Sequence, residues 1–281
     1  MEVLLAKEMG FCFGVKRALA LVEAAAAKGG GLHTLGAVVH NRQVVAHLES
    51  LGVACARSLE EVGQTLAVPS HGASPQIFAE AEARGLQVVD ATCPMVRTAQ
   101  KKAESLARDG FQVIIFGDPG HAEVRGMAAW AEPKAVVVTT EDDLAGLPSA
   151  RKLAVLSQTT QSLAAFRRLV GTLIEQRLGE ASQVVVHNTI CNATLQRQQA
   201  ALELAQEVEV MVVVGGHDSA NTRRLMELCG RAGVPTYQVE SADEVQPAWF
   251  AGFCRAGVTA GASTPDWIIE PVVERIRAFG D

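Results

Sequence analysis

Several features that mark other classes of protein are missing from this 281-residue sequence. No window holds the roughly 20 mostly apolar residues that a membrane-spanning helix needs. Residues 1–5 include neither a basic segment nor a long apolar one, which argues against a secretory signal. No block of like charges is long enough to suggest an acidic or basic tail. We therefore expect a cytoplasmic protein without a membrane anchor.

Other absences bear on cofactors and partners. The six cysteines form no close pairs, so the chain does not resemble a disulfide-dense secreted scaffold and suits a reducing compartment. The formal net charge of -6 argues against nucleic acid as the main partner. The sequence has neither a Walker lysine motif nor a Gly-x-Gly-x-x-Gly motif after a strand-like run, so it does not indicate a nucleotide cofactor.

The bulk composition is that of an ordinary enzyme with more than one domain. With 48% hydrophobic and 20% charged residues, the chain lies in the usual range for globular proteins. Its 281 residues exceed the usual size of one domain, so we expect two or three. A chain of this length buries enough surface to fold without disulfides.

Short apolar runs alternate with amphipathic stretches along the sequence. Such runs are typical of strands that are buried on both faces of a parallel sheet. They lie at 67–68, 113–116, 135–138, 153–156 and 210–214. The amphipathic stretches predict helices over 15–27, 95–109, 163–177 and 194–206. This alternation of strand and helix predicts an α/β fold.

Three of the cysteines, Cys12, Cys93 and Cys191, share one local setting. Each follows an apolar run and precedes a helix-prone stretch that carries a basic residue. One sulfur ligand from each of three similar units suggests a metal centre with an open coordination position. The other cysteines lack this setting and are interpreted as structural; they are Cys55, Cys229 and Cys254.

The positions of these three cysteines also suggest the domain organisation. They are 81 and 98 residues apart, which divides the chain into three stretches of similar length. We expect three α/β domains over 1–94, 95–192 and 193–281, joined without obvious linkers.

Neutral hydrogen-bond donors follow most of the apolar runs. Ligands of open α/β sheets bind beyond the carboxyl ends of the strands. His, Ser, Thr and Asn beside Gly are suited to hold phosphate oxygens there, particularly at helix N-termini. Glu123 follows one of these runs and is either an ordinary first-turn carboxylate or a catalytic acid. The donors are His40, Asn41, His71, His121, Thr159, His217, Ser219, Asn221 and Ser263.

Three widely spaced cysteines fit two kinds of metal site. They could bind zinc, with a histidine or water as fourth ligand, or three irons of a [4Fe–4S] cluster. Structural zinc sites usually draw two ligands from one close Cys-x-x-Cys pair, which this chain lacks. Ligands at three helix starts suit a cluster with a large negative charge. The residues therefore favour the cluster and leave zinc as the alternative.

Many of these residues fall in motifs that resemble those of the 4-hydroxy-3-methylbut-2-enyl diphosphate reductases, the LytB-type family of the methylerythritol phosphate route to isoprenoids. The match runs from residue 10 to about residue 267 in the family's order. The motifs are Gly-Phe-Cys-Phe-Gly-Val-Lys-Arg-Ala at 10–18, Val-His-Asn at 39–41, His-Gly at 71–72, Asp-Ala-Thr-Cys-Pro at 90–94, Gly-His-Ala-Glu-Val at 120–124, Ser-Gln-Thr-Thr at 157–160, Thr-Ile-Cys-Asn-Ala-Thr at 189–194 and Thr-Ala-Gly-Ala-Ser-Thr-Pro at 259–265. So many motifs in one register make the resemblance specific.

The resemblance implies three similar α/β domains in a pseudo-threefold trefoil around a central iron–sulfur cluster. The implied cofactor is a [4Fe–4S] cluster with one open iron, ligated by Cys12, Cys93 and Cys191. The implied reaction removes the allylic hydroxyl of a small diphosphate substrate with two electrons and two protons. It yields isopentenyl and dimethylallyl diphosphate, and a ferredoxin or flavodoxin-type protein would donate the electrons.

The resemblance also implies roles for single residues. The implied catalytic residues are Glu123, Thr159 and His121, of which Glu123 would relay protons and Thr159 would hydrogen-bond the hydroxyl. The implied substrate-binding residues are His40, His71, His121, Ser219, Asn221 and Ser263. Three features depart from the family pattern: Ala122 stands where proline is usual, Asp118 and Pro119 make the preceding loop unlike that of many members, and Ala220 replaces a second serine.

Two other functions fit some of these features. A quinolinate-synthase-like enzyme also combines three α/β units with a three-cysteine cluster, but it would need Arg or Lys at the strand ends for carboxylates. The strand ends here are poor in both. A zinc-stabilised binding or regulatory protein would use the cysteines without turnover. The colour and the metal content of the protein separate these alternatives.

Overall fold

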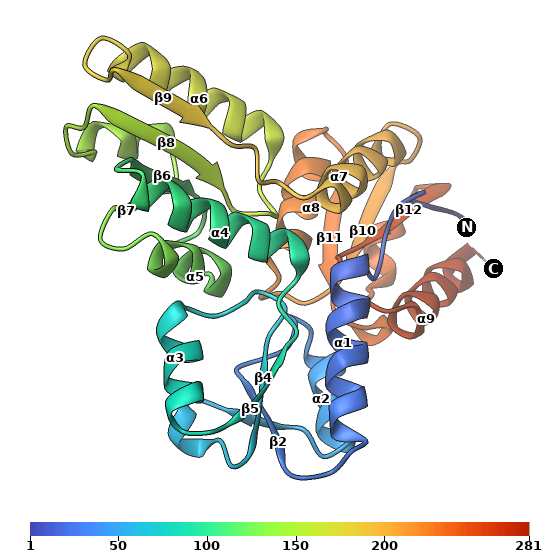
Figure 1. Cartoon of the computed structure of the whole chain (residues 1–281). Helices are drawn as coiled ribbons and strands as arrows, with labels where there is room; N and C mark the ends of the chain where they lie inside the picture. The colour runs from blue at the N-terminus through green and yellow to red at the C-terminus, as the bar shows by residue number, and fades with distance from the viewer. Residues whose placement is uncertain (281) are drawn as a thin grey trace. The chain divides into compact units, whose positions relative to one another are not determined.

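The computed structural model describes residues 1–280 and contains three parallel β-sheets of four strands each (Figure 1). The N-terminal sheet has the strand order β3-β2-β4-β5, the middle sheet β7-β6-β8-β9 and the C-terminal sheet β11-β10-β12-β1. These parallel α/β units confirm the predicted fold class. The strands are β1 (Glu2–Leu5), β2 (Leu32–Leu35), β3 (Ala54–Ala56), β4 (Thr65–Val68), β5 (Gln87–Asp90), β6 (Gln112–Phe116), β7 (Ala135–Val138), β8 (Lys152–Ser157), β9 (Gln183–Val186), β10 (Val210–Val214), β11 (Thr236–Val239) and β12 (Arg255–Ala260).

Helices connect the strands of each sheet, as parallel pairing requires. The four helices predicted from sequence are confirmed as α1, α4, α6 and α7, with ends that differ by at most two residues. In α4, buried side chains recur at Val96, Ala99, Ala103 and Leu106, which is the spacing of one helix face. The α-helices are α1 (Phe13–Ala26), α2 (Arg42–Ser50), α3 (Pro75–Ala83), α4 (Pro94–Arg108), α5 (Ala122–Trp130), α6 (Leu163–Arg177), α7 (Asn192–Ala205), α8 (Ala220–Arg231) and α9 (Asp266–Arg277).

The three sheets share one topology. In the N-terminal and middle sheets, the fourth strand along the chain is the edge strand that leads to a cysteine, β5 to Cys93 and β9 to Cys191. In the C-terminal sheet this edge position belongs to β1, which pairs with β12 from Glu2↔Arg255 to Leu5↔Val258. Cys12 therefore leaves its sheet at the same place as the other two cysteines leave theirs.

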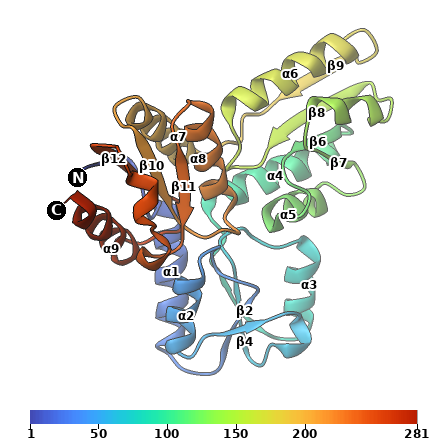
Figure 2. The ribbon, with the colours of Figure 1, turned by 180° about the vertical axis from the view of Figure 1, so that it is seen from behind.

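The central strands form the cores. In β10, alternate residues face opposite layers: Val212 packs with Ile268 of α9, and Met211 packs with Leu225 of α8 (Figure 2). The middle sheet has the same build around β6, whose Ile115 is fully buried. The run at 135–138 departs from the prediction of burial on both faces, because it forms the edge strand β7 and only its last residue is buried.

The chain separates into two compact units. Unit 1 comprises Met1–Lys16, Val39–His47 and Asn192–Asp281 and holds the C-terminal sheet. Unit 2 comprises Arg17–Val38 and Leu48–Cys191 and holds the N-terminal and middle sheets. This separation into two units does not test the predicted domain boundaries. The division into 1–94, 95–192 and 193–281 stays a prediction.

Within residues 1–280, no helix combines the length and the apolar character that crossing a membrane requires.

Candidate metal centre and substrate site

Each of the three candidate metal ligands stands at the start of a helix. Cys12 precedes the first residue of α1, Cys93 precedes Pro94 of α4, and Cys191 precedes the first residue of α7. None of the three is in a disulfide, and all three are partly exposed. A helix N-terminus presents unpaired N–H groups and stabilises negative charge, so these positions suit sulfur ligands of a metal. One hydrogen bond from such an N–H group to sulfur is present: Val15 N–H donates to Cys12 Sγ at 3.5 Å.

One backbone hydrogen bond holds every candidate ligand in the same way. The cysteine N–H donates to the carbonyl of the residue that lies two positions beyond the end of the neighbouring strand. The three pairs are Cys12 with Ala262 at 3.1 Å, Cys93 with Ser70 at 2.9 Å, and Cys191 with Thr159 at 3.0 Å. The threefold repetition seen in the sequence is therefore also a repetition of local geometry.

In the middle sheet, Glu123 is buried and bonded to Thr159. Glu123 is the second residue of α5 and only 3% exposed. Its Oε1 accepts the N–H of Thr159 at 2.6 Å, and its Oε2 pairs with the Thr159 hydroxyl at 2.8 Å. Burial raises the pKa of this carboxyl to about 7, although both Thr159 bonds act to lower it. Glu123 can therefore both donate and accept a proton near neutral pH.

Thr159 connects this carboxyl to a candidate metal ligand. The side chain and the N–H of Thr159 contact Glu123, while its carbonyl accepts the N–H of Cys191. A titratable acid, a hydroxyl and a thiol are thus linked through one residue at the ends of β8 and β9. The sequence predicted all three residues as site residues, but not the hydrogen bond between Thr159 and Cys191.

His121 lies at the N-cap of α5. Its Nδ1 accepts the N–H of Glu123 at 3.2 Å. In the neutral ring the proton is therefore on Nε2, which makes Nε2 the atom that can donate to a ligand. This bond also fixes the first turn of α5, on which Glu123 is carried.

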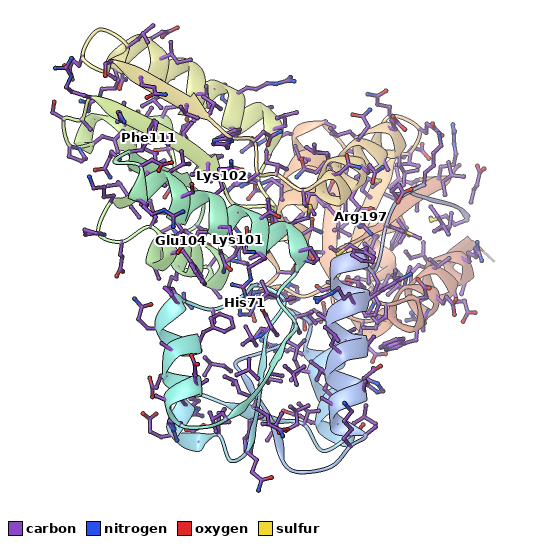
Figure 3. All side chains as sticks on the ribbon, viewed as in Figure 1. His71, Lys101, Lys102, Glu104, Phe111 and Arg197 are labelled. Carbon is purple, nitrogen blue, oxygen red and sulfur yellow. The ribbon has the colours of Figure 1, made fainter. Side chains whose placement is uncertain are left out.

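His71 lies in the loop after β4, in the N-terminal sheet (Figure 3). The loop packs against Gln100 of α4, which is fully buried and donates to Ala73 O at 3.5 Å. Gly72 has a φ of +77°, and a Cβ there would lie 2.5 Å from Gln100 Nε2. Only glycine fits this position, so the loop that carries His71 is closely held.

The candidate phosphate donors of unit 1 lie on three strand-end loops. Ser263 Oγ donates to His40 O at 3.3 Å, and Ser219 is the N-cap of α8, where its side chain accepts from Thr222 N–H. A Cβ on Gly216 would lie 2.7 Å from His40 O, so the loops after β2 and β10 touch through bare backbone. Burial lowers the pKa of His40, although the charge of Asp218 acts to raise it. The lowered pKa keeps the His40 ring neutral at pH 7.

Asn221 of unit 1 is a buried amide whose polar atoms have no partner within residues 1–280. It is 5% exposed, and neither its Oδ1 nor its Nδ2 has a hydrogen-bond partner within residues 1–280. Buried amides without partners are rare in folded proteins because they cost free energy. Its Nδ2 can therefore donate to an acceptor oxygen of an external group, whereas its Oδ1 requires a donor.

Arginines hold the loops that lead to two of the cysteines. Arg197 of α7 donates to Gly10 O, and Arg17 of α1 donates to Thr92 O at 3.1 Å. Arg97 of α4 adds an ion pair with Asp90 at 2.6 Å. The sequence showed a basic residue behind each cysteine but not these partners, and the partners of Arg17 and Arg197 lie 75 and 187 positions away along the chain.

Three further cysteines and one histidine cluster lie outside this site. Cys229 is buried in the core of the C-terminal sheet, where burial raises the pKa of its thiol to about 11, whereas Cys55 and Cys254 are exposed. His217, whose role the sequence left open, lies near Glu240 and Glu244, with ligand atoms within 4.8 Å of one another. These groups already bond to each other, with His217 N–H donating to Glu240 at 2.7 Å.

The predicted site residues are distributed over both units. Cys12, His40, Ser219, Asn221 and Ser263 belong to unit 1. The others belong to unit 2 and are His71, Cys93, His121, Glu123, Thr159 and Cys191. The structure directly links Glu123, Thr159 and Cys191. That all eleven residues serve one site stays a prediction.

Comparisons with known proteins identify the family. The model of the LytB protein family matches residues 3–277. The 4-hydroxy-3-methylbut-2-enyl diphosphate reductase of Geobacter metallireducens is 45% identical over 278 residues, which are 99% of this chain and 97% of that protein. The reductase of the same name from Geobacter sulfurreducens is 45% identical over 280 residues, or 99% of this chain and 98% of that protein.

Solved structures agree with these matches. The E-1-hydroxy-2-methyl-but-2-enyl-4-diphosphate reductase of Plasmodium falciparum superposes with a TM-score of 0.92 at 27% identity, covering 97% of this chain and 87% of that one. A structure of (E)-4-hydroxy-3-methyl-but-2-enyl diphosphate reductase, described as the terminal enzyme of the non-mevalonate pathway, gives a TM-score of 0.71 at 40% identity and covers 99% and 100% of the two chains. The resemblance drawn from the motifs is confirmed, and this chain belongs to the LytB protein family.

Proposed function

We propose that this chain is a reductase that converts 4-hydroxy-3-methylbut-2-enyl diphosphate to isopentenyl and dimethylallyl diphosphate. The linkage of Glu123, Thr159 and Cys191 carries the proposal, because it joins a proton donor with a pKa of about 7 to a candidate metal ligand. Relatives that bear this activity in their names match nearly the whole chain. Family membership favours the reductase over a quinolinate-synthase-like enzyme.

The proposed cofactor is a [4Fe–4S] cluster ligated by Cys12, Cys93 and Cys191. Three partly exposed thiols at helix starts fit this group, and each is held by an equivalent backbone hydrogen bond. When bound, the cluster would supply electrons and an open iron that polarises the hydroxyl of the substrate. Zinc on the same three thiols is the alternative that metal analysis tests.

The overall reaction replaces a C–O bond by a C–H bond and consumes two electrons and two protons, with water as the other product. Hydroxide is a poor leaving group, so an acid must protonate the departing oxygen. Glu123 is about half protonated at neutral pH and can pass its proton through the Thr159 hydroxyl. His121 Nε2 offers a second donor, fixed by the bond from Glu123 N–H to Nδ1.

The other end of the substrate, the diphosphate, would be bound by neutral donors. The unpartnered amide of Asn221 and the hydroxyls of Ser219 and Ser263 are candidates, together with the neutral ring of His40 and the side chain of His71. Binding energy at this non-reacting end can hold the hydroxyl in place for the reaction.

Two of the departures from the family pattern lie at the first residue of a helix. Ala122 begins α5 and Ala220 begins α8. Proline is favoured at a first helical position because its fixed φ suits the turn, but alanine is compatible with the same conformation. Glu123 consequently keeps its place in α5. The change at Ala220 removes only a hydroxyl, and Ser219 and Asn221 on either side remain.

Anaerobic purification followed by a turnover assay tests the proposal. We expect a brown protein with about four irons per chain. It should consume the hydroxylated allylic diphosphate when reduced viologen supplies electrons. C93S should lose iron and turnover. A colourless zinc protein, or an iron protein that leaves this substrate unchanged, would contradict the proposed function. The ferredoxin or flavodoxin-type donor and the cytoplasmic location stay predictions.

A further inference from the structure

Arg197 is a buried cation whose partners are backbone carbonyls. It lies in α7 and is 4% exposed (Figure 3). Its Nε and one Nη donate to Gly10 O at 3.1 and 2.9 Å, and the other Nη donates to Ala193 O at 2.9 Å. The guanidinium is therefore well satisfied as a hydrogen-bond donor, but these bonds leave its charge without a negative partner.

Three part-buried arginines of this chain pair with carboxylates, whereas Arg17 bonds a backbone carbonyl. Arg97, Arg177 and Arg224 contact Asp90, Glu180 and Glu227, respectively. Within residues 1–280, Arg197 makes no such ion pair. Asp266 approaches Gly10 but is exposed and unpaired with Arg197. A buried charge without a counter-charge is unfavourable, so an anion that the protein chain does not provide is expected nearby.

The carbonyls that Arg197 binds belong to segments next to two candidate cluster ligands. Gly10 precedes Cys12 by two residues, and Ala193 follows Cys191 by two residues. Neighbouring Cα atoms are about 3.8 Å apart, so two residues place each carbonyl within roughly 8 Å of a cysteine backbone. A Cβ on Gly10, whose φ is +72°, would lie 3.2 Å from Thr264 O, so the loop packs closely against the segment after β12.

We propose that Arg197 is the buried counter-charge of the iron–sulfur cluster, where it favours the reduced state, and that its bonds to Gly10 position Cys12. This inference rests on the proposed function. A cluster held by three thiolates is negatively charged, and one-electron reduction makes it more negative. A fixed cation stabilises the more negative state and raises the reduction potential. Charge and hydrogen bonding are separate contributions here, so different substitutions can resolve them.

The test compares R197Q and R197K with the wild type. All three are purified anaerobically, and the midpoint potential of the cluster is measured by dithionite titration followed by electron paramagnetic resonance. R197Q removes the charge, and we expect its midpoint potential to be lower. R197K keeps the charge but cannot offer the two bonds to Gly10, so we expect a potential close to the wild type and a shorter cluster lifetime in air.

R177Q is the matched control. Arg177 of α6 also ties down a loop through carbonyls, donating to Leu144 O at 2.8 Å and Leu147 O at 3.2 Å. That loop contains no cysteine. R177Q should lower the stability of the protein but leave the midpoint potential unchanged. If the midpoint potential shifts as much in R177Q as in R197Q, then a general loosening of the protein, rather than the charge of Arg197, changes the potential.

The remaining outcomes are also decisive. An intact cluster with an unchanged potential in R197Q overturns the proposal while leaving the reductase function standing. If R197Q loses its cluster during purification, the iron content of R197K becomes the deciding measurement. Iron loss in R197K equal to that in R197Q would show that the charge of residue 197 does not support the cluster. Wild-type protein without iron would contradict the proposed function itself.

Discussion

Both carboxylate oxygens of Glu123 are bonded to one residue, Thr159, which also accepts the N–H of Cys191. The acid is therefore positioned by the same residue that positions a candidate metal ligand. A displacement of Glu123 or of Cys191 is therefore transmitted to the other through Thr159. Substitutions of Glu123 or Thr159 can change proton transfer while the three thiols stay in place.

Replacing Glu123 by glutamine should remove the proton donor and keep the shape of the side chain. We expect turnover to fall by about 10²–10⁴-fold, the usual contribution of general acid catalysis, with an unchanged iron content. E141Q is the control, since Glu141 pairs with Arg168 and belongs to no predicted site. Wild-type turnover in E123Q, measured with reduced viologen, would show that another group delivers the proton.

The stability of the protein should depend on pH through the same carboxyl. Its pKa is raised from 4.5 to about 7, so between these values the unfolded chain has lost a proton that the folded chain keeps. Its contribution to stability is full below pH 4.5 and is lost as the pH rises through 7, by about 3 kcal/mol in total. Urea unfolding at pH 5 and pH 7.5 should show this loss in the wild type and lack it in E123Q. An equal loss in both proteins would assign it to other groups.

Thr159→Val should raise the pKa of Glu123 further, because the hydroxyl bond that stabilises the carboxylate is removed. The backbone bonds to Glu123 and Cys191 remain available. We expect the alkaline limb of the kcat/KM profile to move to higher pH and the maximal rate to fall about 10–100-fold as the relay is lost. T159S keeps the hydroxyl and should restore the wild-type profile. If the alkaline limb does not move in T159V, that limb does not report the titration of Glu123.

Asn221→Leu should affect substrate binding and stability in opposite directions. The buried amide lacks partners within residues 1–280, so an apolar side chain of similar size removes an unsatisfied group. We expect the free energy of unfolding without substrate to stay the same or rise. The affinity for the diphosphate should fall by at least about 10-fold, as the loss of a hydrogen bond to a charged group predicts. Loss of stability together with unchanged affinity would indicate a purely structural residue.

Gly216→Ala should disturb the contact between the loops after β2 and β10. The added Cβ would lie 2.7 Å from His40 O, and we expect a destabilisation of about 1–3 kcal/mol together with a higher KM. G230A is the control, because Gly230 lies in α8 with nothing within 4 Å, and it should stabilise by roughly 0.5–1 kcal/mol. Calorimetry and steady-state kinetics on both variants measure the difference. A G216A protein that matches G230A in both would show that the loops are free to separate.

Features that depend on neighbouring residues could be predicted from the sequence. The strand, cysteine and helix pattern is local, so it located Cys12, Cys93 and Cys191 at helix starts and gave the helices within two residues. The motif order, together with these positions, identified the family. Apolar runs alone could not distinguish a central strand from an edge, which is why the run at 135–138 was expected to be buried on both faces.

Long-range relationships could not be predicted in this way. Arg197 and Gly10 are 187 positions apart, and no local pattern connects them. The pKa of Glu123 depends on burial by several segments and on bonds to Thr159, 36 positions away. Likewise, no periodicity indicates that β1 pairs with β12. These features depend on tertiary packing, which the spacing of apolar residues does not specify.

The pairing of β1 with β12 gives this protein a built-in order of assembly. During synthesis Glu2 leaves the ribosome long before its partner Arg255, so β1 stays unpaired until almost the whole chain has emerged. The backbone bond from Cys12 to Ala262 has to wait for the same moment. Cys93 and Cys191 depend only on strands that are already present. A truncated or stalled chain would therefore present two prepared thiols and one without its support, and metal loading would distinguish finished from unfinished molecules.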